Sequence, residues 1–314
     1  MSANRLGIIL VNFGSHDLLR KNLAVLDLQQ IDALVVVVDN FSGHQERAQI
    51  QSLSQSQNWE LLTPSKNLGF GAGMNLGVEH AITLGCTSFV LLNPDVSITV
   101  SALSKLHEVG RHCEFTLLSP RINRPDGSVW FAGGQLNLRT GRTSSQFAAE
   151  QRGPERWITG ACLFVDLQTW VKLKGFDLRY FLYWEDVDLS QRCLHLGGDL
   201  QVVHEVTVTH TVGATQGTQG KSPTYNYYMC RNRLLFASLN RPSSDAWQWL
   251  LHTPAATARV AFRDGKLQAL THPRRTSAAV GGAFVGSWML IRSVLLAKRR
   301  SEKTPQPLAG PSRG

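Results

Sequence analysis

The densest group of chemically active side chains lies between residues 175 and 189. The letters GFD at 175–177 are followed by YFLYWEDVDL at 180–189, which puts three acids within four positions beside four aromatic side chains. An acidic helix start, stabilised by the helix dipole, explains the acids but not the aromatics. An aromatic-walled pocket that stacks on a sugar ring, with one carboxylate as general base toward a hydroxyl group, explains both.

A second group could bind a divalent cation. Asn93-Pro94-Asp95 follows the apolar run at 88–92, at the carboxyl end of a predicted strand, where α/β sheets place their ligands. A carboxylate there can bind a cation that neutralises a diphosphate leaving group. His210 ends the last predicted strand and could complete the coordination sphere. A plain Asn-Pro-Asp turn and a structural histidine are the alternatives.

Two further places suggest contacts with a nucleotide. Asp39 follows four valines, and its carboxylate could accept hydrogen bonds from a pyrimidine imide or a ribose; an Asx turn through Asn40 is the alternative. The glycine-rich segment 66–75 lacks the spacing of a dinucleotide-binding loop, because Met74 stands where a third glycine is needed. Its asparagines suggest a loop that hydrogen-bonds a ligand, and loop geometry alone is an equal explanation.

The elements that must position these residues are those of an α/β sheet. Short β-branched apolar runs alternate with helical spacing over the first 95 residues, which predicts a doubly wound start. The predicted strands of this part are 6–13, 34–39, 60–63 and 88–92, and the predicted helices are 17–28 and 73–84. Further on we predict strands at 117–122, 128–131, 157–166 and 201–209, helices at 167–173 and 186–196, and a mobile loop at 139–156.

Taken together, these motifs resemble glycosyltransferase family 2, which has the GT-A fold, and most closely its bacterial rhamnosyltransferase-like branch. The resemblance covers about residues 5–240. It rests on motifs that match in order and spacing, namely VNF at 11–13, VDNFS at 38–42, NLGFG at 67–71, LNPD at 92–95, WITGA at 157–161, GFD at 175–177, YWEDVDL at 183–189 and His210. It implies an α/β fold with a Rossmann-like, doubly wound mixed sheet, followed by a helical, basic C-terminal tail.

The resemblance also implies a role for each motif. Asp186 would be the catalytic base. Asp95 and His210 would bind the metal, whereas Trp184 and Glu185 would lie on the acceptor side. The residues that would hold the nucleotide sugar are Asn12, Asp39, Asn67, Gly69, Gly71, Asn93 and Asp95.

One position departs from the family pattern. The first acid of the family's D-x-D signature is Asn93 here, so a Mg²⁺ or Mn²⁺ ion would have one carboxylate ligand fewer. The activity that the resemblance implies is transfer of a sugar from a nucleoside diphosphate to a hydroxyl group, with inversion at the anomeric carbon. The branch favours dTDP-rhamnose as donor and a lipid-linked or cell-envelope glycan as acceptor.

Two other functions compete with this interpretation. A nucleotidyltransferase that makes a sugar nucleotide would need a basic glycine-rich loop near the N-terminus, and residues 7–15 contain no Lys or Arg. A non-catalytic scaffold that binds glycan or membrane is the other alternative, and the intact acidic cluster argues against it.

The net charge of +9 is concentrated in the C-terminal part. Eleven of the 32 Lys and Arg residues but only two of the 23 acidic residues lie in 256–314, so residues 1–255 have no net charge. This distribution favours electrostatic attachment of a neutral catalytic body and argues against a nucleic-acid partner. Residues 276–291 carry no charge but are too few to span a bilayer. We therefore predict an interfacial helix on an anionic membrane surface, with an ordinary core or oligomer helix and a membrane-spanning helix as the alternatives.

These observations predict three parts of the chain. They are a GT-A domain at 1–240, with a nucleotide-sugar half to about 100 and an acceptor half from about 101, a helical membrane-surface extension at 241–300, and a disordered end at 301–314. The chain enters a predicted strand at once, which leaves no room for a signal peptide, and its five scattered cysteines predict reduced thiols. The expected location is cytoplasmic, peripheral at the inner face of the cell membrane.

Overall fold

The computed structural model describes residues 5–145, 155–211, 221–263, 265 and 271–303. The chain divides into two compact units, Met1–Leu138 with Arg142–Tyr225 and Arg139–Gly141 with Asn226–Gly314. The three functional parts predicted from the sequence remain a prediction. Of the predicted disordered end, residues 301–303 belong to a helix, and the rest lies outside the described residues.

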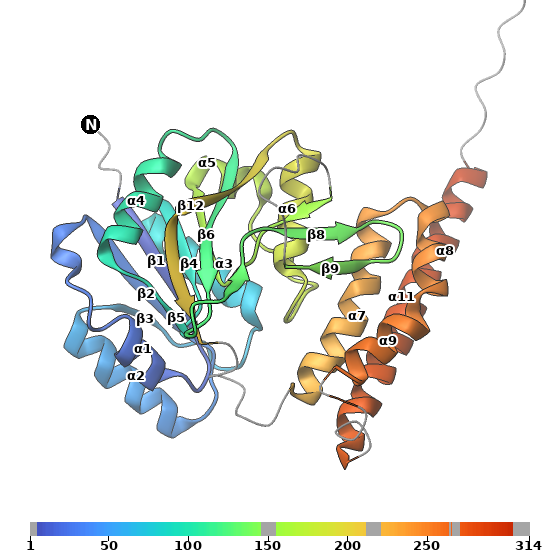
Figure 1. The fold of residues 1–314 in the computed structure, drawn as a ribbon, viewed down its shortest axis with the longest axis horizontal. Helices are drawn as coiled ribbons and strands as arrows, with labels where there is room; N and C mark the ends of the chain where they lie inside the picture. The colour runs from blue at the N-terminus through green and yellow to red at the C-terminus, as the bar shows by residue number, and fades with distance from the viewer. Residues whose placement is uncertain (1–4, 146–154, 212–220, 264, 266–270, 304–314) are drawn as a thin grey trace, which may run out of the picture. The chain divides into compact units, whose positions relative to one another are not determined.

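The first unit is built around a nine-stranded mixed sheet (Figure 1). Its strands follow the order β3-β2-β1-β4-β11-β6-β12-β5, and β7 pairs with β6. The strands are β1 (Arg5–Asn12), β2 (Ala33–Asp39), β3 (Glu60–Leu62), β4 (Cys86–Leu92), β5 (Val96–Ser97), β6 (Thr116–Asn123), β7 (Val129–Phe131), β11 (Cys162–Asp166) and β12 (Asp199–His210). β1, β2, β3 and β4 run parallel, whereas β11 is antiparallel to its neighbours β4 and β6. The predicted doubly wound mixed sheet is confirmed.

Helices cover both faces of this sheet (Figure 1). They are α1 (His16–Asn22), α2 (His44–Gln57), α3 (Phe70–Thr83), α4 (Val100–Gly110), α5 (Leu167–Leu173) and α6 (Glu185–His195). The central strands are apolar on both faces, which is why Ile8, Ile9 and Val37 are completely buried. On one face, glycines let α3 approach the strands closely, since a Cβ at Gly77 would lie 2.5 Å from the Ile9 side chain.

Several predicted boundaries shift in the structure. The predicted strand 157–166 is two strands, β10 (Arg156–Trp157) and β11, because the chain turns at Gly160 and Ala161 between them. The predicted mobile loop 139–156 contains β9 (Arg142–Ser144), which forms a three-stranded sheet with β8 (Gly134–Asn137) and β10; residues 146–154 lie outside the described residues. α3 begins at Phe70, so Asn75, expected in a ligand-binding loop, lies inside a helix.

The second unit is helical. Its helices are α7 (Pro223–Asn240), α8 (Ser243–Leu251), α9 (Thr253–Ala261) and α11 (Pro273–Lys303), which confirms the predicted C-terminal helix. Arg233 is buried here, and its guanidinium donates to the carbonyls of Thr140 and Trp249 and to the Thr253 hydroxyl. Arg233 therefore holds parts of this unit together.

Candidate active site

The segment between β10 and β11 holds two predicted parts of the site. Gly160 donates its N–H to Oδ2 of Asp186 at 3.1 Å. The carbonyl of the next residue, Ala161, accepts the N–H of Asn93 at 2.9 Å. The predicted base and the Asn-Pro-Asp turn, which are far apart in the sequence, are thus joined through one dipeptide.

Asp186 lies in the first turn of α6 with its side chain partly exposed. Its Oδ1 accepts the N–H of Val187 at 2.8 Å, while Gly160 holds Oδ2. Burial raises the pKa of Asp186 above its ordinary value, although the two N–H groups offset part of this rise. A carboxylate with a raised pKa is a stronger proton acceptor, as a general base must be, and the role of Asp186 as that base stays a prediction.

The two residues before Asp186 are buried. Trp184 is 4% exposed and Glu185 is 6% exposed, so neither presents an open side chain in this structure. The Oε2 atom of Glu185 has no hydrogen-bond partner among the described residues. Burial, together with the charge of Asp186, raises the pKa of Glu185 well above its usual range. Contact of Trp184 and Glu185 with an acceptor stays a prediction.

The backbone that leads into α6 has an unusual conformation. Tyr183 and Trp184 have φ values of 65° and 74°, in the left-handed region that bulky residues rarely adopt. Such conformations persist only where the surroundings enforce them, and they are common at functional sites. Of the four aromatics in this segment, Tyr180 and Trp184 belong to the core, which leaves only Phe181 and Tyr183 partly exposed.

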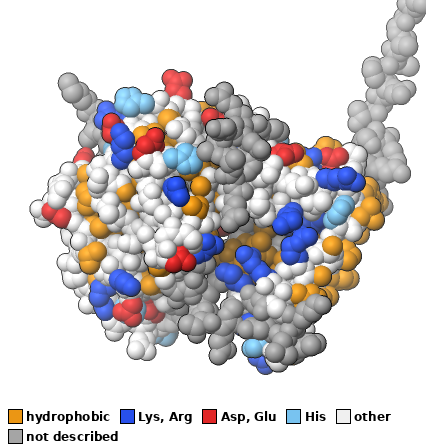
Figure 2. Space-filling view, viewed as in Figure 1, with side chains coloured by type: hydrophobic (Ala, Val, Ile, Leu, Met, Phe, Trp, Pro, Cys, Tyr) orange, Lys and Arg blue, Asp and Glu red, His pale blue; other side chains and the backbone are white. Residues whose placement is uncertain are grey.

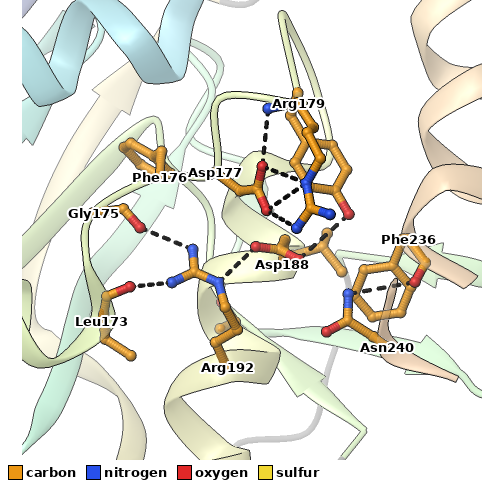
Figure 3. Close-up of polar contacts among 12 residues, drawn as sticks. Leu173, Gly175, Phe176, Asp177, Arg179, Asp188, Arg192, Phe236 and Asn240 are labelled. Atoms are coloured by element: carbon orange, nitrogen blue, oxygen red, sulfur yellow. Dashed lines mark hydrogen bonds and ion pairs between the residues drawn. The ribbon is translucent and has the colours of Figure 1, made fainter. Parts of the chain in front are cut away.

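Arg192 in α6 forms a hydrogen-bond network with the segment that precedes this helix (Figure 3). The Arg192 guanidinium donates to Asp188 at 2.7 Å, to the carbonyl of Gly175 at 2.9 Å and to the carbonyl of Leu173. The other oxygen of Asp188 accepts the Tyr180 hydroxyl at 3.3 Å. Arg192 and Asp188 therefore tie α6 to both the end of α5 and the loop before Asp186.

A second clamp acts on the same loop from α3. The side-chain amide of Asn75 donates to the carbonyl of Phe176 at 2.8 Å and accepts the N–H of Phe176 at 2.9 Å. Both amide atoms of Asn75 are engaged by backbone, which favours a structural role, and contact of Asn75 with a ligand stays a prediction. The carbonyl of Phe181 accepts the N–H of Phe70 at 2.9 Å, which adds a third attachment.

The predicted cation ligands lie together. Nε2 of His210 is 3.0 Å from Oδ1 of Asp95, and both side chains are buried. β12 brings them together, because His210 pairs with Val96 in β5, directly after Asp95. The ring of Trp130 stands edge-on to the His210 ring, with 4.3 Å between the ring centres.

The donor set fits a divalent cation. Two ligand atoms that bind one octahedral ion at about 2.1 Å and at right angles lie about 3 Å apart, which is the Asp95–His210 spacing. Oδ1 of Asn93 is buried and has no hydrogen-bond partner among the described residues, so it is a third possible ligand atom, from the same turn as Asp95. In the part of the chain that the structure describes, no group of three or more His, Cys, Asp or Glu side chains gathers. Asp95 and His210 would hold the ion, with Asn93 adding a neutral oxygen.

Asn12 and Asp39, predicted to hold the nucleoside, meet at the carboxyl ends of β1 and β2. Nδ2 of Asn12 donates to Oδ1 of Asp39 at 3.3 Å, and both residues are completely buried. Nε of Arg47 donates to Oδ2 of Asp39 at 2.6 Å. Asp39 is therefore oriented by two donors, and each of its oxygens can still accept a further hydrogen bond.

Glu46 completes this corner. It accepts Nδ2 of Asn12 at 3.0 Å and the N–H of His16 at 2.8 Å, and its other oxygen lies 2.6 Å from Nδ1 of His16. Burial alone would raise the pKa of Glu46, but the hydrogen bonds from Asn12 and His16 outweigh it and hold the pKa below its usual range. The corner thus carries two acids, Asp39 and Glu46, where the sequence indicated one.

The predicted glycines pack against the loop that leads to Asp186. Gly69 has φ of 88°, and a Cβ there would lie 2.3 Å from the carbonyl oxygen of Phe181; a Cβ at Gly71 would lie 2.9 Å from Phe176. Asn67 caps this turn by accepting the N–H of Gly69 at 2.8 Å. These contacts give Asn67, Gly69 and Gly71 a structural role, and their contact with a nucleotide sugar stays a prediction.

Sequence reasoning missed Glu46, Arg47 and Trp130. Glu46 and Arg47 lie in α2, whose many Gln and Ser residues give no apolar periodicity to predict a helix. Trp130 lies in the three-residue strand β7, which pairs with β6, and nothing in the nearby sequence indicates its contact with His210. Only the topology of the sheet brings these residues to the site.

Comparisons with known proteins were made for the sequence and for the fold. No family model matches the chain. The N-acetylglucosaminyl-diphospho-decaprenol L-rhamnosyltransferase of Mycobacterium tuberculosis (strain ATCC 25618 / H37Rv) is 26% identical over 215 residues, covering 60% of this chain and 69% of the relative. The same relative from strain CDC 1551 / Oshkosh matches equally well.

Two solved structures resemble the fold. GalNAc-T7 with UDP, GalNAc and Mn²⁺ matches with a TM-score of 0.55 and 15% identity, over 81% of this chain and 54% of that chain, so the match spans about half of GalNAc-T7. The mannosyltransferase PcManGT from Pyrobaculum calidifontis in complex with GDP-Man and Mn²⁺ matches with a TM-score of 0.52 and 14% identity, over 96% of this chain and 88% of that chain.

The fold is therefore that of the GT-A glycosyltransferases, as the sequence predicted. The sequence similarity to the mycobacterial enzyme is a more specific comparison than the similarity of fold. It supports the place of the chain in the rhamnosyltransferase-like branch of glycosyltransferase family 2.

Proposed function

We propose that the chain is an inverting glycosyltransferase that moves a sugar from a nucleoside diphosphate to a hydroxyl group of a lipid-linked or cell-envelope glycan. Rhamnose, delivered as dTDP-rhamnose, is the proposed sugar, since the mycobacterial relative is named as an L-rhamnosyltransferase that acts on a diphospho-decaprenol lipid. The solved structures that share the fold contain UDP or GDP-Man, which supports a nucleotide-sugar donor of this general kind.

One observation carries this proposal. The Gly160-Ala161 dipeptide holds the Asp186 carboxylate through Gly160 and the Asn93 turn through Ala161. A proton acceptor and a cation-binding turn attached to the same dipeptide suit a reaction in which a hydroxyl attacks a carbon that is leaving a diphosphate. The binding corner at Asn12 and Asp39 lies at the ends of adjacent strands of the same sheet.

The chemical step is a single in-line displacement. The acceptor oxygen forms a bond to the anomeric carbon while the bond from that carbon to the diphosphate oxygen breaks, and the electron pair leaves with the nucleoside diphosphate. Asp186 takes the proton of the acceptor hydroxyl, and the N–H of Gly160 keeps its carboxylate in place. Because the attack comes from the face opposite the leaving group, the anomeric configuration inverts.

A divalent cation, proposed as Mg²⁺ or Mn²⁺, would be held by Asp95 and His210 and would supply positive charge for the departing diphosphate. Both solved structures that share the fold contain Mn²⁺, which supports a divalent cation in this fold. The edge-on ring of Trp130 fixes the plane of His210, so that its Nε2 stays directed at Asp95.

A location at the cytoplasmic face of the membrane belongs to the same proposal. The lipid-linked substrate in the name of the mycobacterial relative supports it, because such a substrate is anchored in a bilayer. The basic residues concentrated in 256–314 would attract the chain to an anionic membrane surface.

The test is a donor and acceptor screen with the purified full-length chain. Nucleoside diphosphate release is measured with a panel of nucleotide sugars, with and without a polyprenyl-diphosphate-linked N-acetylglucosamine acceptor, and dTDP-rhamnose is expected to give the highest rate. Asp186→Asn should lower the rate at least about 100-fold. Asp126→Asn, in an exposed turn, should leave it unchanged.

Other outcomes would contradict the proposal. Turnover of Asp186→Asn near that of the unchanged protein would remove Asp186 as the base. Pyrophosphate exchange with a nucleoside triphosphate and a sugar phosphate would favour a nucleotidyltransferase. Failure to bind any nucleotide sugar would favour a scaffold.

A further inference from the structure

α11 has two different faces, and one of them is packed against α7. Ala279 and Leu290 are completely buried on this face. A Cβ added at Gly282 would lie 2.1 Å from the carbonyl oxygen of Tyr227, and one at Gly286 would lie 2.8 Å from that of Arg231. Only glycine permits so close an approach, so α7 and α11 form one closely packed pair.

The other face of α11 carries an exposed apolar stripe. Its members recur every three or four residues, which places them on one side of the helix. They are Val280, Phe284, Trp288, Ile291 and Leu295, with exposed fractions of 56%, 75%, 56%, 38% and 52%. Figure 2 shows hydrophobic side chains gathered over the helices of this unit.

The stripe belongs to a larger concentration of exposed apolar side chains. Fourteen large hydrophobic side chains are exposed in the described part of the chain, and nine of them lie between Trp247 and Leu296. Scattered exposed apolar residues are normal, but a concentration of this kind marks a surface that binds a partner or a membrane.

Charge indicates which partner this surface binds. No Asp or Glu occurs between Asp264 and Glu302, whereas Lys and Arg occur at both ends of the apolar run. The Arg292 guanidinium lies over the Trp288 ring, 5.4 Å from its centre. Tryptophan beside arginine is typical of the boundary between lipid headgroups and acyl chains, where each basic residue gains about 1 kcal/mol from an anionic leaflet.

The packing on α7 decides how α11 meets a bilayer. By length and composition, Pro273–Leu296 is long and apolar enough to cross a membrane. A crossing would place α7 in the hydrocarbon as well, because α7 is held against α11. The buried polar residues of α7, Asn226, Asn232 and Arg233, make that costly.

We infer that α11 lies in the plane of an anionic bilayer and inserts its apolar stripe into one leaflet, with α7 on the side away from the lipid. This inference deepens the proposed membrane partner and rests on it. It assigns the attachment to one helix face: the stripe supplies the insertion, and the flanking basic residues supply the attraction.

Flotation of the full-length chain with lipid vesicles tests the inference. Vesicles of phosphatidylcholine with about one third phosphatidylglycerol should bind the chain, and pure phosphatidylcholine vesicles should bind it at least about tenfold less. The double variant Phe284→Ser, Trp288→Ser should bind the anionic vesicles at least about tenfold less than the unchanged chain. The matched control is Val171→Ser, Leu196→Ser, which changes two equally exposed apolar residues of the first unit and should bind normally.

Two further measurements separate insertion from attraction and from crossing. Arg274→Glu with Arg292→Glu should weaken binding mainly at low salt, because surface charge is screened by salt. Alkaline carbonate should release the bound chain, since a helix in the membrane plane does not span the bilayer.

Four results would overturn the inference. The first three are unchanged vesicle binding by the Phe284 and Trp288 variant, equal binding to both kinds of vesicle, and resistance to carbonate extraction. The fourth is that the unchanged chain binds no vesicles but forms a dimer, and that the double variant is a monomer. Donor turnover in solution is measured in parallel. If the unchanged chain bound vesicles normally but showed no donor turnover, the proposed transferase activity would be contradicted and the membrane inference would not.

Discussion

Replacing Arg192 with methionine removes a guanidinium that three acceptors use. The Asp188 side chain, only 2% exposed, would keep only the Tyr180 hydroxyl among its hydrogen bonds described above. Removing one partner of a buried ion pair costs about 3–5 kcal/mol, and the carbonyls of Leu173 and Gly175 also lose a donor. Because Arg192 itself is 25% exposed, we expect a total near the lower end, about 3–4 kcal/mol.

Thermal unfolding of the full-length chain measures this loss. At about 2–4 °C per kcal/mol for a unit of this size, Tm should fall by about 6–16 °C. Arg20→Met is the matched control, because it breaks an exposed ion pair. The side chain of Arg20 is 55% exposed and that of its partner Asp17 is 77% exposed. Such a pair contributes less than about 1 kcal/mol, so the control should move Tm by less than about 4 °C.

The same variant tests the connection to the site. Since Arg192 supports the loop that leads to Asp186, turnover of Arg192→Met should fall at a temperature where the protein is folded, while donor affinity at the Asn12 and Asp39 corner is kept. Arg192→Lys, which keeps the charge for Asp188, should restore part of Tm. A Tm within about 2 °C of the unchanged protein would refute the argument that Asp188 depends on Arg192.

Three other changes give expected outcomes. Glu185→Gln should raise Tm by a few degrees at pH 8 and have almost no effect at pH 4. The reason is that the pKa of Glu185 is raised in the folded state, so the folded protein becomes less stable as the pH rises through that pKa and the buried carboxyl ionises. Gly69→Ala should lower Tm by about 5–10 °C, since a Cβ there meets the carbonyl of Phe181 and φ is 88°. Mn²⁺ bound beside His210 should change the fluorescence of Trp130, whose ring lies edge-on to His210. His210→Ala should abolish this change.

Each of these predictions has its own control. The Tm difference of Glu185→Gln must shrink on acidification, and a constant difference would contradict a titrating carboxyl. Gly43→Ala, with no neighbour within 4 Å of the added Cβ, should leave Tm nearly unchanged. Trp130→Phe should lose the fluorescence signal but keep the Mn²⁺ affinity, and an unchanged signal in His210→Ala would argue against the proposed cation site.

Several predicted site residues lie where the sequence placed them, at the ends of strong strand signals. Asp39 and Asp95 follow runs of buried β-branched and apolar residues, and parallel strands bring their carboxyl ends to one edge, so their positions could be inferred from periodicity alone. His210 was placed by the same reasoning, and its contact with Asp95 agrees with it.

Other features of the site depend on tertiary contacts. The composition of 180–189 predicts an aromatic-walled pocket, and in this structure Trp184 and Glu185 are buried beside the left-handed backbone at Tyr183 and Trp184. Glu46 and Arg47 are invisible to pattern analysis, because their importance comes from the position of α2 beside Asp39. A local sequence pattern specifies an element, whereas the direction of a side chain within a turn is set by what packs against it.

The Gly160-Ala161 dipeptide fixes a distance in a way that packing cannot. The two groups are each one hydrogen bond away from this dipeptide, so only a planar peptide unit and the backbone torsions of two residues separate their attachment points. Substitutions that loosen the core should therefore shift the proton acceptor and the Asn93 turn together and preserve their spacing. The Gly160 amide, protected by Asp186, would then report in hydrogen exchange on the integrity of both at once.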